Sequence, residues 1–289
     1  MNKIAEIGII GGSGLYNIDG LSEKKWVSVK TPFGKPSDRY LTGNLLGKKI
    51  AFLPRHGCKH DVLPTDVNYC ANIYGFKSLG VERIVCLSAV GSLRENIRPL
   101  DIVVVEQFID RTNQARKTTF FGEGVVAHIS FADPVCPIMR KVACEVLSDM
   151  KVRFHKTGTY LNMEGPAFST KAEANLYRSW GADIIGMTNM PEARLCREAE
   201  ICYASIAFVT DYDCWRESGE IVTAKMVLDN LSKNVSVAKK LIKEIIPKLP
   251  GKRTCVCQES LKNAIFTNSK HIPAKTKEKL RIIAGKYIF

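Results

Sequence analysis

Three short apolar segments, residues 6–10, 50–53 and 83–87, constrain the fold of this chain more than any other feature of its sequence. Each has the length and composition of a buried strand. Between the second and third segments, apolar side chains in residues 67–79 recur at helical spacing. Because parallel strands need a crossover connection, this strand–helix–strand order favours a sheet with parallel members. The sequence therefore predicts an α/β fold.

The later part of the chain continues this alternation and suggests how the domain is organised. Residues 201–209 form a long apolar run that predicts another buried strand, and residues 228–245 place apolar side chains along one face of an amphipathic helix. The 289 residues, 45% hydrophobic and 25% charged, suffice for one large core. We expect a single domain over residues 1–250, with residues 251–289 as a basic C-terminal extension of the same domain.

Two further helices are predicted from signals at their starts. Asp133 and Pro134 have the pattern of an N-cap followed by proline at the first helical position. Thr170 and Glu173 have the spacing of a capping box, which predicts that a second helix follows.

The formal net charge of +13 admits two classes of anionic partner, nucleic acids and small anions drawn into a cleft. The lysines late in the chain form no long run, and aromatic residues do not alternate with them, so we do not expect nucleic-acid binding. The sequence has no stretch near the ~18–20 apolar residues that span a bilayer, and residues 1–10 lack the layout of a signal peptide. We therefore expect a cytoplasmic protein without a membrane partner.

A glycine-rich segment, Gly8-Ile-Ile-Gly-Gly-Ser-Gly14, includes the end of the first apolar run and the turn after it. Glycines after a strand let backbone N–H groups approach an anion, and Ser13 adds a hydroxyl donor. A dinucleotide fingerprint would need a third glycine where Asn17 stands, and a Walker loop would need a lysine that the segment lacks. The loop therefore fits a small phosphate, with a tight glycine turn as the alternative.

Two other strand ends offer partners for an anion. Arg55 has a fork of donors suited to phosphate, His56 adds a ring N–H, and Ser88 adds a hydroxyl. His56, Cys58 and His60 also suggest a metal site, but no second ligand cluster matches them, so we expect no metal there. Solvated turns are the alternative for these segments.

Two later segments offer groups for a flat base and a sugar. Phe168 could stack on a base and Ser169 could line its edge, while Met187 offers an apolar face and Thr188 a hydroxyl. The alternatives are a core phenylalanine before a capping box and a helix cap at Thr188.

Two carboxylates, Asp211 and Asp213, follow the apolar run 201–209. In extended geometry, residues two apart point to the same side of a strand. Placing two carboxylates there costs stability unless they are paired or used. A solvated Asx turn is the alternative.

Taken together, these segments resemble the trimeric purine nucleoside phosphorylases, and among them the members that act on S-methyl-5'-thioadenosine. The matching segments occur in the family's order between about residue 7 and residue 245. They are Ile7–Gly14, Thr31–Asp38, Arg55–Gly57, Ser88–Arg94, Gln107–Arg111, Glu164–Pro166 and Thr210–Trp215.

The resemblance implies a nucleoside phosphorylase fold, a mixed and distorted β-sheet or barrel flanked by helices. It implies phosphorolysis of S-methyl-5'-thioadenosine to adenine and 5-methylthioribose-1-phosphate, with inorganic phosphate as co-substrate and no cofactor or metal. It also implies a homotrimer, in which His128 reaches the site of a neighbouring subunit; whether trimers pair into hexamers is left open. The phosphate would lie among Ser13, Arg55, His56, Ser88, the Ala89 backbone and Thr188. The 5' substituent would be enclosed by Val222, Ala224, Val227 and Leu228.

The chemistry of glycosidic bond cleavage explains why the family uses these residue types around the base. In the family, Phe168 and Met187 would contact base and ribose, and the two aspartates would face the purine edge. Asp211, as general acid, would protonate the purine N7, which at neutral pH requires that burial raise its pKa. Ionised Asp213 would accept a hydrogen bond from a 6-amino group. A 6-oxo group would instead place its own acceptor oxygen against the carboxylate, at a cost of roughly 1–3 kcal/mol. We therefore expect a 6-aminopurine substrate.

The sequence departs from the family pattern at three places. Ala224 stands where the animal enzyme has a larger valine, so adenosine is expected as a further substrate. Cys58 replaces a basic residue. Cys255 and Cys257 form a Cys-X-Cys pair that resembles archaeal and some bacterial members. Ten cysteines in an intracellular protein of this size are expected to be reduced and buried, so we expect free thiols there; a disulfide is the alternative, and a zinc knuckle is disfavoured.

Two other functions remain open from the sequence. The first is a phosphorylase for 6-oxopurine nucleosides or methylthioinosine, which a neutral donor in place of Asp213 would have supported. The second is a non-catalytic protein of the same fold that binds nucleosides or nucleic acid, which the basic C-terminal residues suggest.

Overall fold

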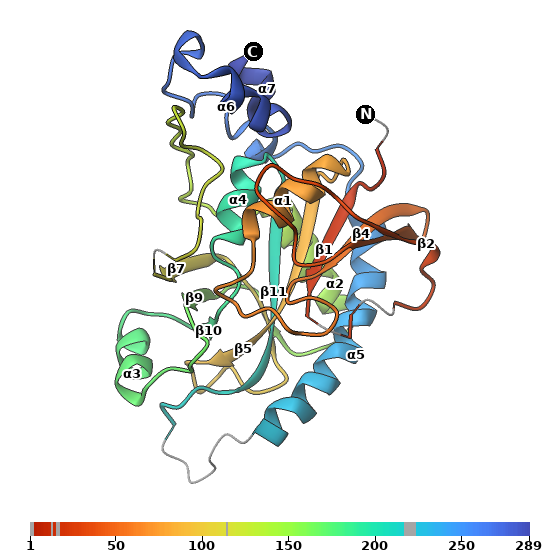
Figure 1. The fold of residues 1–289 in the computed structure, drawn as a ribbon. Coiled ribbons are helices and arrows are strands. Elements are labelled where there is room, and N and C mark those ends of the chain that lie inside the picture. The colour runs from red at the N-terminus through yellow and green to blue at the C-terminus, as the bar shows by residue number, and fades with distance from the viewer. Residues whose placement is uncertain (1–2, 13, 16–17, 114, 217–223) are drawn as a thin grey trace.

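One large mixed sheet runs through the molecule (Figure 1). The computed structural model describes residues 3–12, 14–15, 18–113, 115–216 and 224–289, with only the backbone for 224–228. Among these residues, eleven strands pair into that sheet. The strands are Ile7–Gly11 (β1), Ser22–Val27 (β2), Tyr40–Leu45 (β3), Lys48–Pro54 (β4), Arg83–Ser92 (β5), Ile102–Val104 (β6), Gln107–Arg111 (β7), Phe154–His155 (β8), Thr159–Met163 (β9), Ile184–Gly186 (β10) and Cys202–Tyr212 (β11).

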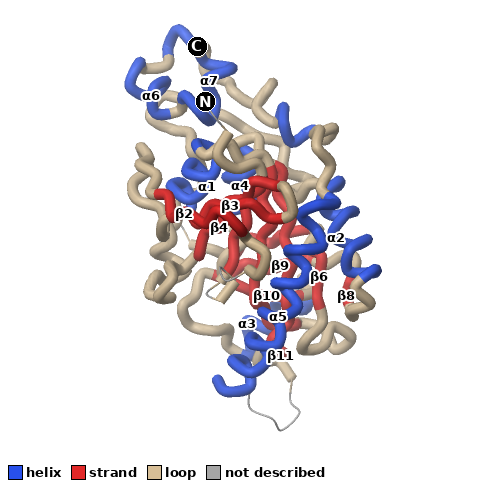
Figure 2. The backbone as a smooth tube through the Cα atoms, turned by 90° about the vertical axis from the view of Figure 1, so that its right-hand side faces the viewer, coloured by secondary structure: helices blue, strands red, loops and turns tan. Residues whose placement is uncertain are grey.

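Helices cover both faces of the sheet (Figures 1 and 2). They are Tyr69–Ser78 (α1), Pro137–Asp149 (α2), Lys171–Ser179 (α3), Glu192–Glu198 (α4), Ala224–Lys248 (α5), Ala274–Lys279 (α6) and Arg281–Ile288 (α7), with short 3-10 helices at Val256–Glu259 (η1) and Ser269–His271 (η2). Helices α2 and α5 pack on one face, and α1 and α4 on the other. No helix of the described residues is both long enough and apolar enough to cross a membrane.

The long strand β5 is where the sheet changes direction. Its first half pairs in parallel with β1, its second half pairs antiparallel with β10, and β11 runs parallel along its other edge. Strand β1 also pairs in parallel with β4, so the predicted strand–helix–strand unit β4–α1–β5 is confirmed. This mixed sheet flanked by helices has the architecture that the resemblance implies.

Strand β1 is apolar throughout because both of its faces are covered. Ile7 and Ile9 belong to the buried cluster under α2 and α5, while Ile10 belongs to the cluster under α1 and α4. Such two-sided burial explains why the first apolar segment shows no alternation of polar and apolar residues.

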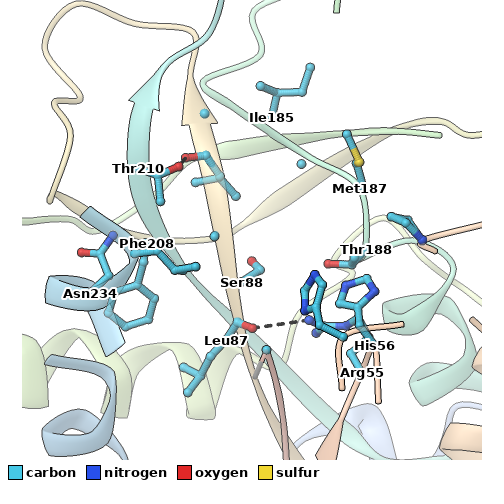
Figure 3. A pocket seen from close by; sticks show the side chains of 18 of the residues that line it. Arg55, His56, Leu87, Ser88, Ile185, Met187, Thr188, Phe208, Thr210 and Asn234 are labelled. Atoms are coloured by element: carbon cyan, nitrogen blue, oxygen red, sulfur yellow. Dashed lines mark hydrogen bonds between the residues drawn. The ribbon is translucent and has the colours of Figure 1, made fainter. Parts of the chain in front are cut away.

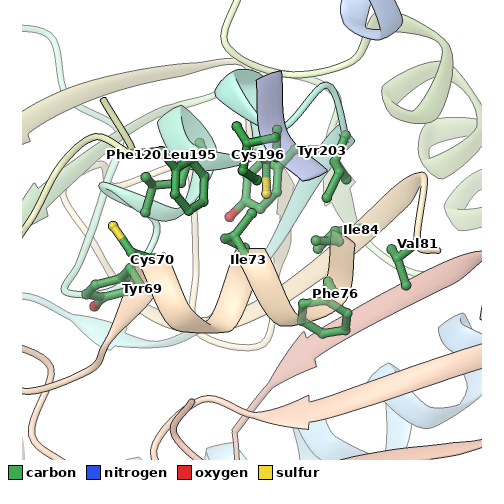
Figure 4. Packing of buried hydrophobic residues seen from close by; sticks show 14 of the residues in the cluster. Tyr69, Cys70, Ile73, Phe76, Val81, Ile84, Phe120, Leu195, Cys196 and Tyr203 are labelled. Atoms are coloured by element: carbon green, nitrogen blue, oxygen red, sulfur yellow. The ribbon is translucent and has the colours of Figure 1, made fainter. Parts of the chain in front are cut away.

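The cluster under α1 joins segments that are far apart in the sequence. Figure 4 shows Ile73 and Phe76 of α1 packed toward Ile84 of β5, with Cys196 of α4 and Tyr203 of β11 above them. The C-terminal residues contribute to the same cluster through Leu261, Leu280, Ile283 and Ile288. Residues 251–289 therefore bury apolar side chains against the sheet domain, which supports the proposal that they extend one domain.

The start of helix α2 differs from the sequence prediction. The helix begins at Pro137, with Cys136 as N-cap, and not at Pro134 after Asp133. Cys136 has extended backbone angles, φ −72° and ψ 118°. Because a residue before proline is pushed out of the helical region, the helix cannot begin before Pro137. Pro137, and not Pro134, therefore marks the start of this helix.

The other two helix predictions are confirmed. Thr170 and Glu173 form a reciprocal capping box at the start of α3, in which each side chain bonds the other residue's backbone N–H. The amphipathic segment 228–245 lies within α5, which extends to Lys248.

Candidate active site

A cavity of about 480 Å³ opens beside the second half of β5 and the end of β11. Helix α5 lines part of it, and the loops after β4 and β10 complete it. Figure 3 shows Arg55, His56 and Thr188 on one side of β5, and Phe208 and Asn234 on the other. The predicted site residues that line this one cavity are Arg55, His56, Ser88, Ala89, Phe168, Met187, Thr188, Asp211 and Asp213.

Arg55 is fully buried and its guanidinium is paired. Nε donates to Oε2 of Glu192 at 2.9 Å, and Nη2 donates to Oε1 of Glu192 at 3.1 Å. Tyr203 donates its hydroxyl to the same carboxylate at 2.9 Å. The fork that the sequence analysis assigned to phosphate therefore faces Glu192. The guanidinium is therefore charge-compensated and fixed in orientation, rather than a pair of free donors.

His56 lies next to Arg55 as a neutral ring. Its Nδ1 lies 2.8 Å from the carbonyl oxygen of Val62, so Nδ1 carries the proton that it donates. Burial, together with the nearby Arg55 charge, lowers the pKa of His56 to about 4. An anion bound in the cavity would oppose both effects and favour the protonated ring.

Ser88 and Thr188 are buried hydroxyl residues at the same end of the cavity. Asn189 fixes this region from behind: its Nδ2 donates to the hydroxyl oxygens of Ser205 at 3.0 Å and of Ser88 at 3.4 Å. Ala89, in contrast, is exposed although it lies within β5, and it lines the same cavity. An oriented guanidinium and two hydroxyls together form a cradle suited to a small oxyanion.

A bulge in β11 brings the two carboxylates to the cavity. The pairing of β11 with β5 shifts register between Val209 and Asp211, and such bulges redirect the side chains that follow. A β-carbon placed on Gly91 would lie 3.2 Å from Asp211 Oδ1 and 3.5 Å from the Asp213 β-carbon. Gly91 thus lies between the two aspartates, and its lack of a side chain leaves space there.

The two carboxyl groups are poor in partners. Asp211 Oδ2 accepts a hydrogen bond from the Thr210 hydroxyl at 2.6 Å, and burial raises the pKa of Asp211, as the sequence analysis expected. Burial also raises the pKa of Asp213 to about 6, and the charge of Asp211 adds to the rise. Within the described residues, Asp213 Oδ2 is buried without a hydrogen-bond partner. An unsatisfied buried acceptor that lines a cavity suits a ligand that donates a hydrogen bond.

Some predicted residues do not line this cavity. Ser169 is buried, and its hydroxyl donates to Met163 Sδ at 3.6 Å. His128 lies in a second hollow with Arg140 and Arg197. Its ring packs on the ring of Phe266, with the two ring centroids 5.1 Å apart. Ser13 and Val222 lie outside the described residues, as do the side chains of Ala224, Val227 and Leu228.

Sequence analysis missed the asparagines of α5. Asn234 Nδ2 donates to the Val209 carbonyl at 3.0 Å, and Asn230 Nδ2 donates to the Thr210 carbonyl at 2.8 Å. These bonds tie helix α5 to the bulged end of β11 and hold the helix over the cavity. Polar residues next to the apolar face of an amphipathic helix were the signal that could have revealed them.

Arg116 is a second residue that was missed. Its guanidinium is buried and donates to Glu164 Oε1 at 2.8 Å and to the carbonyls of Met187 and Met190 at 2.7 and 2.8 Å. It therefore ties the Glu164 segment to the loop that carries Met187 and Thr188. An isolated arginine in a loop gives no sequence pattern that would indicate this role.

Comparisons with known proteins agree over almost the whole chain. Residues 6–247 match the phosphorylase superfamily. The S-methyl-5'-thioadenosine phosphorylase of Koribacter versatilis is 56% identical over 283 residues, which cover 98% of this chain and 97% of that protein. That of Geobacter sulfurreducens is 54% identical over 282 residues, 98% and 99% of the two chains.

Solved structures give the same result. A methylthioadenosine phosphorylase sourced from an Antarctic soil metagenomic library superposes with a TM-score of 0.93 at 45% identity, over 98% of this chain and 99% of that one. A variant of adenosine/methylthioadenosine phosphorylase from Schistosoma mansoni in complex with adenine gives a TM-score of 0.80 at 34% identity, over 86% and 93%.

Proposed function

The chain belongs to the phosphorylase superfamily, and we propose that it catalyses the phosphorolysis of S-methyl-5'-thioadenosine to adenine and 5-methylthioribose-1-phosphate. It is an enzyme, a pentosyltransferase that uses a nucleoside and inorganic phosphate. The observation that carries the proposal is the near-complete match to relatives of that name. The cavity supports it, because an oxyanion cradle and a carboxyl pair share one space.

The proposed reaction divides the cavity into two ends. Phosphate lies at the end with Arg55, Ser88 and Thr188, where an oriented guanidinium and hydroxyl donors stabilise it. The purine lies toward Asp211 and Asp213, so that the anomeric carbon is between the two ends. As the glycosidic bond breaks, the ribose gains positive charge, which the phosphate stabilises before it attacks. Asp211 gives its proton to N7 of the departing base.

Asp213 is the proposed determinant of base preference. Its unpaired Oδ2 accepts the hydrogen bond that a 6-amino group donates. Asp213→Asn replaces one acceptor by a donor, so we expect kcat/KM for S-methyl-5'-thioadenosine to fall and that for the 6-oxo analogue methylthioinosine to rise. If the substitution costs the 6-amino substrate roughly 1–3 kcal/mol and favours the 6-oxo substrate by as much, the ratio of their kcat/KM values changes by about 30-fold or more. An unchanged ratio, measured by release of free base, would exclude this role.

The pKa of Asp213 also predicts a pH dependence. In the free enzyme, its pKa of about 6 means that it is protonated below that pH and cannot act as a pure acceptor. We expect kcat/KM for S-methyl-5'-thioadenosine to fall about tenfold per pH unit below about pH 6, and Asp213→Asn to lack this acid limb. For the free energy of unfolding the direction is opposite: because the folded pKa of Asp213 is raised, its contribution favours folding at low pH and is lost as pH rises through 6. A profile of kcat/KM that stays flat from pH 7 to pH 5 in the unmodified enzyme would contradict the assignment.

Two finer features belong to the proposal. Adenosine is a second substrate; the support is the small residue Ala224, where the resemblance implies a wall for the 5' substituent, and the name of the Schistosoma mansoni relative, an adenosine/methylthioadenosine phosphorylase. The assembly is a trimer in the cytoplasm; its support is that His128 lies outside the cavity of its own chain, where a neighbouring subunit could use it. Sedimentation equilibrium should give the mass of three chains or of six, and a monomer with full activity would exclude a shared site.

One assay tests the proposed function. The protein is incubated with S-methyl-5'-thioadenosine, adenosine or inosine, with and without phosphate, and the free base is measured. We expect adenine release that requires phosphate. Release without phosphate would indicate a hydrolase, and preference for inosine would indicate a 6-oxopurine phosphorylase. No product, together with strongly salt-dependent nucleic-acid binding, would indicate the non-catalytic alternative.

A further inference from the structure

Four cysteines converge far from the cavity. Cys136, Cys202, Cys255 and Cys257 are all buried, and their sulfur atoms all lie within 4.8 Å of one another. The sequence analysis considered only the Cys-X-Cys pair at 255 and 257. It did not anticipate that two further thiols, from the body of the sheet domain, would meet that pair.

The four residues come from three separate parts of the fold. Cys202 is the first residue of β11, and Cys136 is the N-cap of α2. Cys255 precedes the 3-10 helix η1, and Cys257 lies within it. Because the backbone N–H of Cys136 donates to the Tyr203 carbonyl at 2.8 Å, the start of α2 is held against the start of β11. The tail, residues 251–289, then brings the sulfurs of Cys255 and Cys257 to that junction.

We propose that these four thiolates bind one zinc ion in a closed tetrahedral site. Zinc–sulfur bonds of about 2.3 Å place the sulfurs of such a site about 3.8 Å apart. The sulfurs of Cys202 and Cys255 are 3.3 Å apart, and no pair in the cluster exceeds 4.8 Å, so small side-chain shifts bring the four thiols to that spacing. Four sulfur ligands with no oxygen or nitrogen favour zinc over hard cations.

The arrangement of the four sulfurs differs from that of two disulfide bonds. A disulfide needs a sulfur–sulfur distance of about 2.05 Å, and all four thiols are free. Each of the four sulfurs is near the other three, as ligands around one ion would be, rather than near a single partner.

Two features of the chain offset the charge of such a site. Zinc with four thiolates carries two negative charges. Cys136 lies at the N-terminus of α2, a 13-residue helix whose dipole stabilises a thiolate there. Residues 251–289, which supply the other half of the ligands, contain nine Lys and Arg but only two Asp and Glu.

The site is structural rather than catalytic. Cys202 and Asp211 are nine residues apart on β11, which at ~3.3 Å per residue separates the thiols from the carboxyl pair by roughly 30 Å. Zinc would fasten the tail to the sheet domain. The fastened tail in turn holds the loop of His128, whose backbone N–H donates to the Ala264 carbonyl at 2.8 Å. This inference does not depend on the proposed reaction.

The test is a metal analysis of the full chain, purified under reducing conditions without chelator. We expect about one zinc per chain by elemental mass spectrometry. Cys257→Ser should lower the zinc content at least tenfold and lower the Tm by several degrees. Cys144→Ser is the matched control, since Cys144 lies in α2 outside the cluster, and it should retain its zinc.

A second measurement keeps the test decisive if Cys257→Ser does not fold. The unmodified protein, stripped of metal and titrated with Co²⁺ under reducing conditions, should bind one ion with the intense sulfur-to-cobalt absorption of four thiolate ligands. A chain that carries no zinc and takes up no Co²⁺ would overturn the proposal. So would iron in place of zinc, or an intact mass that lacks two hydrogens for each of two disulfides.

Discussion

Asp211→Ala is expected to lower kcat for S-methyl-5'-thioadenosine by about 10²–10⁴-fold, the range typical of losing a general acid. The fold should remain, because the Thr210 hydroxyl keeps its contact with the Val90 carbonyl at 3.2 Å when the carboxylate is removed. We therefore expect the free energy of unfolding to change by less than about 1 kcal/mol. Steady-state release of adenine and a thermal melt measure the two quantities.

Controls separate proton donation from a general effect of the substitution. Asp149→Ala removes an exposed carboxylate that pairs with Lys248, and it should leave kcat unchanged. A riboside whose leaving group departs without a proton, such as a 4-nitrophenyl riboside, should be cleaved by Asp211→Ala with a much smaller loss than the purine substrate. Full activity of Asp211→Ala toward S-methyl-5'-thioadenosine would remove this residue from the mechanism.

Glu192→Ala is expected to lower the free energy of unfolding by about 3–5 kcal/mol, because it leaves Arg55 buried without its counter-ion. Both side chains are only 2% exposed, so water cannot replace the lost carboxylate. Burial by itself lowers the pKa of Arg55, but the charge of Glu192 outweighs it and holds that pKa well above its ordinary value. For a chain of this length the loss corresponds to a decrease in Tm of about 5–8 °C, measured by calorimetry. The KM for phosphate should rise as well, since Arg55 loses the partner that orients it.

Two further variants test whether the unpaired charge of Arg55 causes the loss of stability in Glu192→Ala. Glu145→Ala breaks an exposed ion pair with Lys141 and should change stability by less than about 0.5 kcal/mol. Replacing Arg55 and Glu192 together by methionine removes both charges and should be less destabilising than Glu192→Ala. If the double variant were the less stable of the two, an uncompensated charge would not be the cause.

Local patterns in the sequence predicted most of the fold. Buried strands such as β1 and β11 are visible as continuous apolar runs, and the capping box at Thr170 is visible from two residues at fixed spacing. The start of α2 was wrong because two prolines compete within four residues, and the steric effect of Pro137 on Cys136 decides between them.

The site was predictable as a set of residues but not as a set of contacts. Arg55 and Asp211 could be named because Arg55 follows strand β4 and Asp211 lies near the end of β11, each in a recognisable motif. The partner of Arg55, Glu192, is 137 positions away, and no local spacing indicates that the two meet. The same holds for the four cysteines, which become a cluster only when the tail folds back onto the sheet. Contacts of this kind depend on the three-dimensional path of the chain.

Gly91 lines the cavity with main chain alone, between the two aspartates. A methyl group there would lie 3.2 Å from Asp211 Oδ1 and from Ile185 Cγ2, closer than ordinary van der Waals contact, so a larger residue fits only if these side chains move. Substitutions that reshape the cavity without displacing Asp211 must therefore fall on its other walls, the loops and helix α5.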